Sequence, residues 1–340
     1  MAEKQTSETS DAKKNWTVGF GVFIGIIVII ILALGAYWSI EPGEFDVQKE
    51  ALKRAKLPSL DKVPEGYVYA NTLAHIAEVL LYKPGGYITN DVAPPGILLD
   101  DITSFEFGAL VMLRDATSAL RNHLARAQSQ SAEDPDLAKA EPYFYYENNS
   151  WALPSTEAEY KKGIDALHSY MSRLLDHKHK TPGHFYTRAD NLWQYVEIVI
   201  KRLGGLSTRL NANTSRYNSL MKINKLDQIE STVKQSAVGR TAWIDIDNVF
   251  WEARGAAWAL LHILKAVKYD FRDILLDKRA MDTVDIMIRE MENALEPVLS
   301  PVILNGDGFG IFANYSLAMA NYISRANAAA LDLRDVMNRG

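Results

Sequence analysis

The chain has 340 residues, of which 48% are hydrophobic and 23% are charged, and its net charge is -5. This length can bury a large core, and the composition is that of a globular protein rather than a disordered one. The acidic balance argues against binding to the phosphate backbone of nucleic acid, because such domains usually carry a basic surplus. The chain has no cysteine, which excludes disulfides, thiolate zinc sites and cysteine nucleophiles.

The first predicted element is a membrane-spanning helix over residues 17–40. This segment contains no charged residue, and residues 18–36 are almost wholly apolar. A helix rises about 1.5 Å per residue, so about 20 residues cross a hydrocarbon core about 30 Å thick. Trp16 lies at one end and Tyr37 with Trp38 at the other, where aromatic rings settle at membrane interfaces. A cleaved signal peptide is the alternative, although its apolar region is usually only about 7–15 residues long.

The charges on either side of this segment predict its orientation. The nearest charged residues are basic before the segment and acidic after it: Lys13, Lys14, Glu41, Glu44 and Asp46. Because basic residues collect on the cytoplasmic side, we expect residues 1–16 to form a short cytoplasmic tail and residues 41–340 to form an outer domain. Basic residues also follow the acidic group, so the charge count alone leaves the opposite orientation open.

Gly21 and Gly25 form a GxxxG pair inside the predicted span. Two membrane helices can approach closely where both lack side chains, so the pair predicts a helix-pairing surface and a homodimer. Glycine is frequent in membrane helices in general, which leaves an unpaired span as the alternative.

The outer domain is predicted to be all-α, a multi-helix bundle with long irregular loops. Apolar residues recur at the spacing of one helical face in several segments, whereas sustained period-2 alternation is nearly absent. Those segments lie at residues 110–124, 160–174, 192–203, 220–233 and 284–295. Antiparallel amphipathic helices of this kind bury their apolar faces against one another.

Local signals predict where some of these helices begin and end. Thr103 with Glu106, and Thr156 with Glu159, have the spacing of a capping box, in which two side chains bond the free N–H groups of a helix start. The glycine pair at residues 204–205 predicts that another helix ends or kinks there.

Two further segments complete the predicted bundle. One form of this bundle divides the domain into two packed halves, with a break near residues 204–242. Residues 243–270 are the most hydrophobic stretch outside the anchor, but charged residues interrupt them, which predicts a buried core helix rather than a second span. The last helix is predicted over about residues 311–337.

The connection at residues 84–104 is the first candidate for a partner or ligand surface. It is rich in proline and glycine, and its candidate residues are Tyr87, Asn90, Asp91, Asp100 and Asp101. Connections this long are often functional, and carboxylates with backbone carbonyls can bind a hard cation. We favour the alternative that asparagine and aspartate bond local N–H groups at turns and helix starts. The sequence therefore predicts no metal.

An aromatic-rich connection at residues 143–151 is the second candidate surface. Its candidate residues are Tyr143, Tyr145 and Trp151, with Glu141 and Glu147 nearby. Aromatic rings with polar neighbours can form a platform for a carbohydrate or a peptide. Packing across the bundle is the alternative for the same side chains.

Two other clusters favour structural roles. His177, His179 and His184 lie close together, but histidines two residues apart face opposite sides of a helix, so a solvated helix end is favoured over a metal site. The glycine-rich residues 305–310 precede the last helix and resemble an anion-binding turn. A nucleotide site would also need a preceding strand, so a structural turn is favoured.

Acid–base pairs of carboxylates can also be drawn from the sequence, as in glycosidases. The candidates are Glu106 with Asp115, and Asp245 with Asp247 and Glu252. Spacing alone does not bring such residues to one cleft. A serine nucleophile elbow, an HExxH motif and a Walker loop are all absent from the sequence, so it predicts no cofactor and favours a non-enzymatic role.

Several runs are more specific than a generic bundle requires: residues 37–47, 83–96, 126–144, 188–196 and 305–329. Together they resemble a family of uncharacterized bacterial inner-membrane proteins with a single span and a domain of unknown function. The resemblance runs from the anchor to the C-terminus. It implies a Gram-negative inner membrane with the domain in the periplasm, and it carries over no catalytic residue.

The first functional hypothesis is a non-enzymatic scaffold, adaptor or assembly factor that presents a periplasmic helical domain to other envelope proteins. Two alternatives stay open, a cell-wall or lipid-processing hydrolase that uses carboxylates and a periplasmic ligand-binding or sensor module. A buried cleft with two carboxylates of different pKa would favour the hydrolase. An apolar pocket with a few polar groups would favour the sensor, and an apolar patch without a cleft would favour the scaffold.

Overall fold

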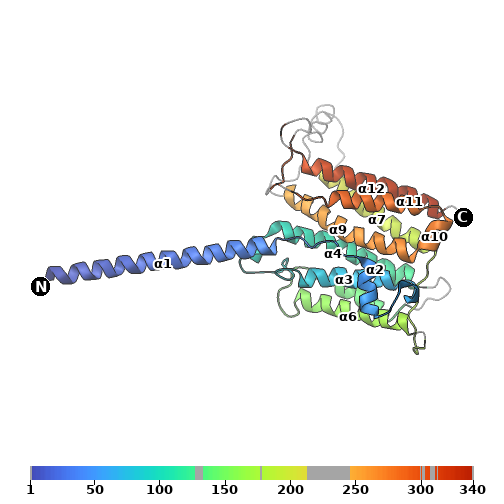
Figure 1. Ribbon diagram of the computed structural model, residues 1–340, viewed down its shortest axis with the longest axis horizontal. Coiled ribbons are helices and arrows are strands. Elements are labelled where there is room, and N and C mark those ends of the chain that lie inside the picture. The colour runs from blue at the N-terminus through green and yellow to red at the C-terminus, as the bar shows by residue number, and fades with distance from the viewer. Residues whose placement is uncertain are drawn as a thin grey trace, which may run out of the picture.

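The protein is an all-α bundle with one projecting helix. The computed structural model describes residues 2–126, 133–176, 178–212, 246–298, 300, 303–306, 311 and 313–338. Within these ranges every regular element is helical, which confirms the predicted fold class. Figure 1 shows the first helix, α1 (Ala2–Trp38), projecting from one end of the bundle, with the bundle helices running roughly along the same direction.

The bundle helices follow in chain order, joined by loops and short helical turns. They are α2 (Val47–Ala55), α3 (Tyr67–Tyr82), α4 (Asp100–Ala119), α5 (Leu137–Phe144), α6 (Thr156–Leu175), α7 (Ala189–Ala212), α9 (Ile246–Asp270), α10 (Arg272–Asp277), α11 (Met281–Ala294) and α12 (Tyr315–Asn338). The shorter turns are Leu60–Lys62, Gly96–Leu98 and a π-helical turn at Leu120–Leu124 that extends α4.

The central helix of the bundle is α9, which lies between α4 on one side and α11 with α12 on the other (Figure 1). Its small and apolar residues are buried on several faces, and Trp258 is among the most deeply buried large side chains. The prediction of a core helix over residues 243–270 is confirmed for the described part. The buried apolar side chains of the bundle form one hydrophobic core from Val47 to Met337.

Two glycines let α4 and α9 cross with their backbones in contact. A Cβ placed on Gly108 would lie 1.9 Å from the carbonyl oxygen of Glu252, and one placed on Gly255 would lie 1.9 Å from that of Phe105. Real Cβ atoms do not approach a backbone this closely. The axes of the two core helices can therefore lie this near each other only with glycine at both positions.

The predicted capping boxes are wrong, because other residues begin or cap these helices. α4 begins at Asp100, three residues before Thr103, and the carboxylate of Glu106 bonds the preceding loop instead of its own helix start. α6 does begin at Thr156, but its N-cap is Ser155, whose hydroxyl accepts a hydrogen bond from the N–H of Ala158 (3.3 Å). A local spacing rule cannot detect that a carboxylate has a stronger partner elsewhere in the chain.

The glycine pair at residues 204–205 does not end a helix, which corrects the predicted stop. α7 continues through both glycines to Ala212. α12 packs along α7, and the hydroxyls of Ser207 and Ser324 lie 2.6 Å apart across the pair. A glycine costs a helix only about 1 kcal/mol relative to alanine, which such packing offsets. The predicted stripe at residues 220–233 and most of the predicted break near 204–242 fall outside the described residues.

Asp270, the last residue of α9, caps another helix from a distance. Its carboxylate accepts a hydrogen bond from the N–H of Tyr69 (2.7 Å) in the first turn of α3, where the N-cap, Gly66, has no side chain. The negative charge stands at the positive end of the α3 dipole. Burial nevertheless dominates, and it raises the pKa of Asp270 to about 7.

This raised pKa predicts that Asp270 makes the bundle less stable as the pH rises. The folded chain holds a proton on Asp270 that the unfolded chain releases near pH 4, so this contribution falls between about pH 4 and pH 7. Asp270→Asn stays neutral and keeps an oxygen acceptor. As the pH rises through that range, we expect its free energy of unfolding to increase by roughly 2–4 kcal/mol relative to that of the parent. Denaturant unfolding in detergent micelles at pH 4 and pH 8 measures it. A difference between parent and variant that does not change with pH would contradict the assignment.

Candidate functional site

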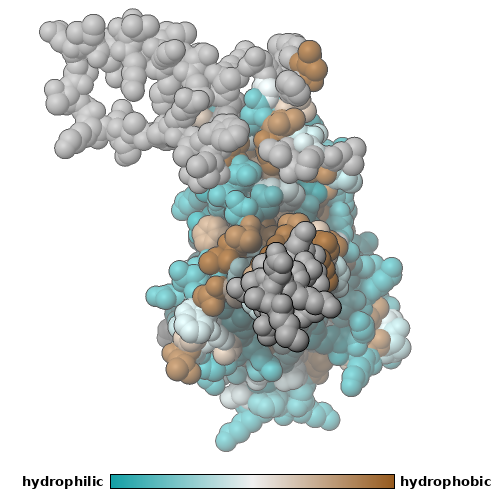
Figure 2. Space-filling view, turned by 90° about the vertical axis from the view of Figure 1, so that its left-hand side faces the viewer, coloured by the Kyte–Doolittle hydropathy of each residue, from teal (hydrophilic) through white to brown (hydrophobic). Residues whose placement is uncertain are grey.

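The two predicted candidate surfaces lie side by side at the end of the bundle from which α1 projects. The amide of Asn90 in the first connection donates to the carbonyl oxygen of Ser150 in the second (2.9 Å) and to the carboxylate of Glu157 (2.8 Å). Figure 2 looks onto this end and shows apolar side chains gathered beside α1 on a largely hydrophilic face. The structure thus unites two segments that are about 60 residues apart in the chain.

A buried ion pair fixes the first connection to α4. The Lys83 ammonium lies 2.7 Å from the Glu106 carboxylate, and their side chains are 1% and 0% exposed. The same carboxylate accepts from the N–H groups of Ile88 and Thr89 (both 2.9 Å), and Lys83 also donates to the carbonyl oxygen of Gly86 (2.8 Å). Burial raises the pKa of Glu106, and the Lys83 charge opposes that rise. The connection is therefore an ordered part of the core.

Two of the predicted surface residues serve this fixation. Tyr87 is 3% exposed and its ring packs edge-on against Tyr160 at 5.6 Å between centroids, and Asn90 is 6% exposed. Their side chains hold the connection down in this conformation, and their role in a partner or ligand surface stays a prediction. A loop of proline and glycine that contains a tyrosine and an asparagine can either pack on the core or stay exposed to solvent. The composition of this loop therefore did not show which of these it does.

The three candidate aspartates differ in their surroundings. Asp91 is half-buried against the loop, and burial, with Glu157 nearby, raises its pKa. Asp100 and Asp101 belong to the first turn of α4 rather than to the loop. Burial raises the pKa of Asp101 to about 6, with smaller contributions from Asp100 and Asp247. Within the described part of the chain, histidine and acidic side chains form no group of three or more that could hold a metal.

The aromatic connection is held by cations. Arg114 donates to the carbonyl oxygens of Phe144 (2.6 Å) and Tyr146 (2.8 Å), and its guanidinium lies 5.6 Å from the ring centroid of Tyr145. Lys162 lies at the same distance from the ring of Tyr143. Packing thus accounts for much of this segment, as the alternative interpretation expected. Tyr145 and Trp151 are exposed, and they keep the prediction of a partner surface.

The last turns of α1 pack against the first connection. A Cβ on Gly35 would be in ordinary contact with Pro95 (3.6 Å) and Leu99 (3.7 Å). The ring of Trp38 lies against Gly85, where a Cβ would come within 2.6 Å of it. Gly85 also has a φ of +83°, a conformation that other residues rarely adopt. Gly21 and Gly25 face open space, and their pairing stays a prediction.

Residues 41–46, here called the strap, run from α1 into the bundle in extended form along α9. Steps of two residues in the strap match steps of four in α9, because two extended residues and four helical residues both span about 6 Å. Three hydrogen bonds form this register: Arg254 Nε to Glu41 Oε2 (2.5 Å), Trp258 Nε1 to the carbonyl oxygen of Gly43 (3.1 Å), and the N–H of Phe45 to His262 Nε2 (3.0 Å). The strap ends at Asp46, which caps α2.

His262 is built into the strap contact as a neutral side chain. Its Nε2 accepts from a backbone N–H, so the proton is on Nδ1, which donates to the carbonyl oxygen of Trp258 (2.7 Å). The rings of Phe45 and His262 stack at 3.9 Å between centroids. Burial is the main reason that the pKa of His262 falls to about 3. This histidine has a structural role at every physiological pH.

Arg254 joins the strap to the end of α11. Besides its pair with Glu41, its guanidinium donates to the carbonyl oxygens of Ala294, Leu295 and Glu296, at 2.9–3.1 Å. The last carbonyls of a helix have no partner within it, so a buried cation there satisfies them and suits the helix dipole. One side chain thus ties the linker from α1 to two core helices.

An open groove of about 790 Å³ lies beside the strap. Its walls mix apolar side chains with charged ones, among them Lys265 and Lys268 of α9. Lys265 lies 3.1 Å from Glu44 and 2.9 Å from Glu292, and Lys268 pairs with Asp285. A small-molecule site is usually enclosed and mostly apolar, so this groove is weak support for a sensor.

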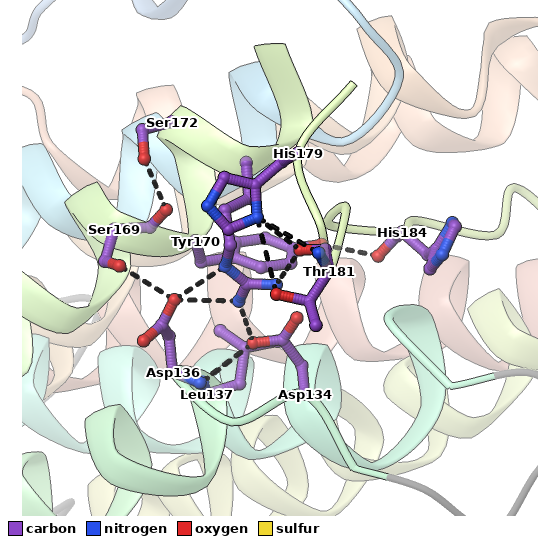
Figure 3. Close-up of polar contacts among 10 residues, drawn as sticks. Asp134, Asp136, Leu137, Ser169, Tyr170, Ser172, His179, Thr181 and His184 are labelled. Atoms are coloured by element: carbon purple, nitrogen blue, oxygen red, sulfur yellow. Dashed lines mark hydrogen bonds and ion pairs between the residues drawn. The ribbon is translucent and has the colours of Figure 1, made fainter. Parts of the chain in front are cut away.

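The histidine cluster lies at the far end of α6 and belongs to a structural network (Figure 3). Arg173 is buried there and bonds Asp134 (2.5 Å), Asp136 (2.8 Å) and the carbonyl oxygen of Thr181 (3.1 Å). Figure 3 also shows the contacts of the two described histidines: His179 Nδ1 lies 3.1 Å from the carbonyl oxygen of Thr181, and Tyr170 donates to that of His184 (2.7 Å). His177 falls outside the described residues.

Three of the carboxylates drawn as acid–base candidates pair with separate cations, and a fourth, Asp247, lies near Asp101. Glu106 is paired with Lys83, Asp115 with Arg202, and Glu252 with Arg209. Asp245 lies outside the described residues.

At the glycine-rich turn before α12, Asn305 and Asn314 form a β-bridge, and Asn314 accepts from the N–H of Leu317 (2.9 Å). That part of the turn caps α12, which begins at Tyr315 rather than near 311, and residues 307–310 lie outside the described ranges.

These features define an all-α protein with one N-terminal helix that is long and apolar enough to cross a membrane, over Gly19–Trp38. A signal sequence would pass the same test of length and composition. The chain belongs to a family described as uncharacterized proteins conserved in bacteria, DUF2333, whose family model matches residues 10–340. The resemblance seen in the sequence is thereby confirmed. No curated protein and no solved structure matches the chain.

Proposed function

We propose that this protein is a non-enzymatic scaffold of the bacterial inner membrane, anchored by α1, which holds its bundle over the periplasmic face for other envelope proteins to bind. The length and apolar character of α1 and the bacterial family support the setting. Acidic residues directly after α1 favour an outer position for the bundle.

The strap is the observation that carries this proposal. An enzyme that only has to stay near a membrane can hang on a flexible linker. Here the linker is bonded to α9 at Glu41, Gly43 and Phe45, and Trp38 packs against the bundle directly. Such a connection fixes both the height and the orientation of the bundle relative to α1, and a fixed position is useful to a protein that aligns partners.

The alternatives have weaker support. The hydrolase needs an open pair of carboxylates, whereas Glu106, Asp115 and Glu252 each form an ion pair with a separate cation. The sensor needs an enclosed apolar pocket, and the groove beside the strap is open and has charged walls. The apolar side chains beside α1 fit the remaining class, a protein that acts through its surfaces.

The anchor and its orientation have a direct test. We expect the mature protein to retain residues 1–40 and to leave membranes only with detergent. A reporter fused after Gly340 should be active only outside the cytoplasm. A mature protein that begins after residue 40 would identify a cleaved signal sequence instead, and a reporter active only inside would reverse the orientation.

The scaffold role is tested by photo-crosslinking in intact cells. A photoreactive residue at Tyr145 or Trp151 should give discrete adducts with other envelope proteins. The same residue at Leu276, an equally exposed apolar position at the other end of the bundle, is the matched control and should not. Bait without adducts at every exposed position, together with hydrolysis of envelope polymers or lipids by the purified chain, would contradict the proposal.

A further inference from the structure

Residues 92–99 form an uncharged segment at the α1 end of the bundle, with the sequence Val-Ala-Pro-Pro-Gly-Ile-Leu-Leu. Three of its large apolar side chains point away from the core: Val92 is 59% exposed, Ile97 is 59% exposed and Leu98 is 66% exposed. A group of exposed apolar side chains on one short segment usually faces a partner or a membrane.

The contact with α1 gives the position of this segment along the helix axis. Pro95 and Leu99 pack beside Gly35, three residues before the end of the apolar stretch at Trp38. At a rise of about 1.5 Å per residue, Gly35 lies about 4.5 Å inside that end. The exposed segment is therefore level with the last turn of the apolar stretch and does not lie beyond it.

The segment is also held rigidly at this level. Pro95 and Gly96 are buried, and the N–H groups of Leu98 and Leu99 donate to the carbonyl oxygens of Pro95 and Gly96, both at 2.9 Å. Before it, the connection is fixed to α4 by the buried pair of Lys83 and Glu106. The three exposed side chains therefore keep their place beside α1.

We propose that residues 92–99 are a membrane-contact element that inserts Val92, Ile97 and Leu98 into the interfacial layer of the bilayer that α1 crosses. The inference rests on the proposed function, because it takes α1 as the anchor. We infer that lipid contacts these side chains, because a helix turn inside the hydrocarbon layer is surrounded by lipid. A segment that packs beside that turn is surrounded by lipid as well. Interfacial segments of this kind bury apolar side chains about 5–10 Å into the boundary of headgroups and acyl chains.

Single cysteines carry the test, because the chain has no cysteine of its own. The full chain is labelled with an environment-sensitive fluorophore at Val92→Cys, Ile97→Cys or Leu98→Cys. Each is reconstituted in vesicles of phosphatidylethanolamine and phosphatidylglycerol that contain lipids with a quencher near the headgroup or deep in the acyl chain. Three positions of similar exposure serve as references: Tyr37→Cys at 56%, Ile30→Cys at 51% and Leu276→Cys at 53%.

We expect the emission of the probes at 92, 97 and 98 to shift to the blue and to be quenched by the shallow quencher as strongly as that of the probe at 37. The probe at 30 should be quenched by the deep quencher, and the probe at 276 by neither. If the probes at 92, 97 and 98 behave like the one at 276 while 30 is quenched, the inference is overturned and the anchor stands. If the probe at 30 is not quenched either, the proposal that α1 anchors the protein in the membrane is contradicted as well. If an added oxidant joins two unlabelled Ile97→Cys chains by a disulfide while the labelled probes show no lipid quenching, the segment is a contact between copies instead.

Discussion

Gly255→Ala is expected to destabilise the bundle by about 3 kcal/mol or more, although it adds one methyl group. The new Cβ would lie 1.9 Å from the carbonyl oxygen of Phe105 and 2.7 Å from its carbonyl carbon. These are backbone atoms of α4, so no side-chain rotation relieves the overlap and the two core helices must separate. Denaturant unfolding of the full chain in micelles measures the loss.

The same substitution at Gly205 is the matched control. Gly205 lies inside α7, and a Cβ there would meet nothing within 4 Å. We expect Gly205→Ala to raise the stability by roughly 0.5–1 kcal/mol, because alanine is the better helix former. Equal effects of the two substitutions would contradict the close crossing of α4 and α9.

Glu106→Gln is expected to cost about 3–5 kcal/mol, because it leaves the Lys83 ammonium buried without a counter-charge. The amide also directs N–H groups at the donors of Ile88 and Thr89, which now bond the carboxylate. The first connection should loosen as well, so limited proteolysis near residues 84–99 is expected to speed up. Unfolding and proteolysis together distinguish a local from a global effect.

An exposed ion pair provides the comparison for this prediction. Lys49 lies 3.3 Å from Asp46, and their side chains are 81% and 46% exposed. Lys49→Met should change the stability by less than about 1 kcal/mol, since solvent screens such pairs. Adding Lys83→Met to Glu106→Gln should recover part of the loss, because the uncompensated charge is then gone. A loss at Glu106 as small as that at Lys49 would show that the connection is held by other contacts.

The features predicted from the sequence are those with a local pattern. α1 follows from an uncharged apolar run, and α9 from an apolar run interrupted by charges. The amphipathic stripes at 160–174 and 284–295 lie on the buried faces of α6 and α11. In each case the spacing of apolar residues along one helix contains all the necessary information.

The features missed depend on partners that are distant in the sequence. Glycine in a helix is a weakening residue by local rules, so Gly108 and Gly255 did not suggest a close crossing, although both stand in runs of small and apolar residues. The strap contacts join residues more than 200 positions apart. A signal for them does exist, because Arg254, Trp258 and His262 put polar groups at four-residue steps along one face of α9.

The candidate surfaces were predicted as two connections with candidate residues in each. Composition indicated the two connections, and the structure brings them together through Asn90. Which side chains face outward depends on the packing of the loop, and so Tyr87 and Asn90 are buried while Val92, Ile97 and Leu98 are exposed. Apolar residues within a loop are ordinarily expected to pack inward. Their exposure beside α1 has an explanation once a bilayer surrounds that helix.

Inserting a flexible glycine-serine segment between Ile40 and Glu41 tests most directly whether rigid presentation is the function. The insertion leaves every strap contact with α9 in place, so the bundle should keep its stability. Trp38→Ala in the same chain removes the direct packing of α1 against Gly85, so that the fixed relation between α1 and the bundle is lost. An equal insertion after Gly340 is the control. In the crosslinking assay we predict that adducts at Tyr145 and Trp151 disappear or change identity only with the first insertion. The same adducts in undiminished yield from both chains would contradict the account.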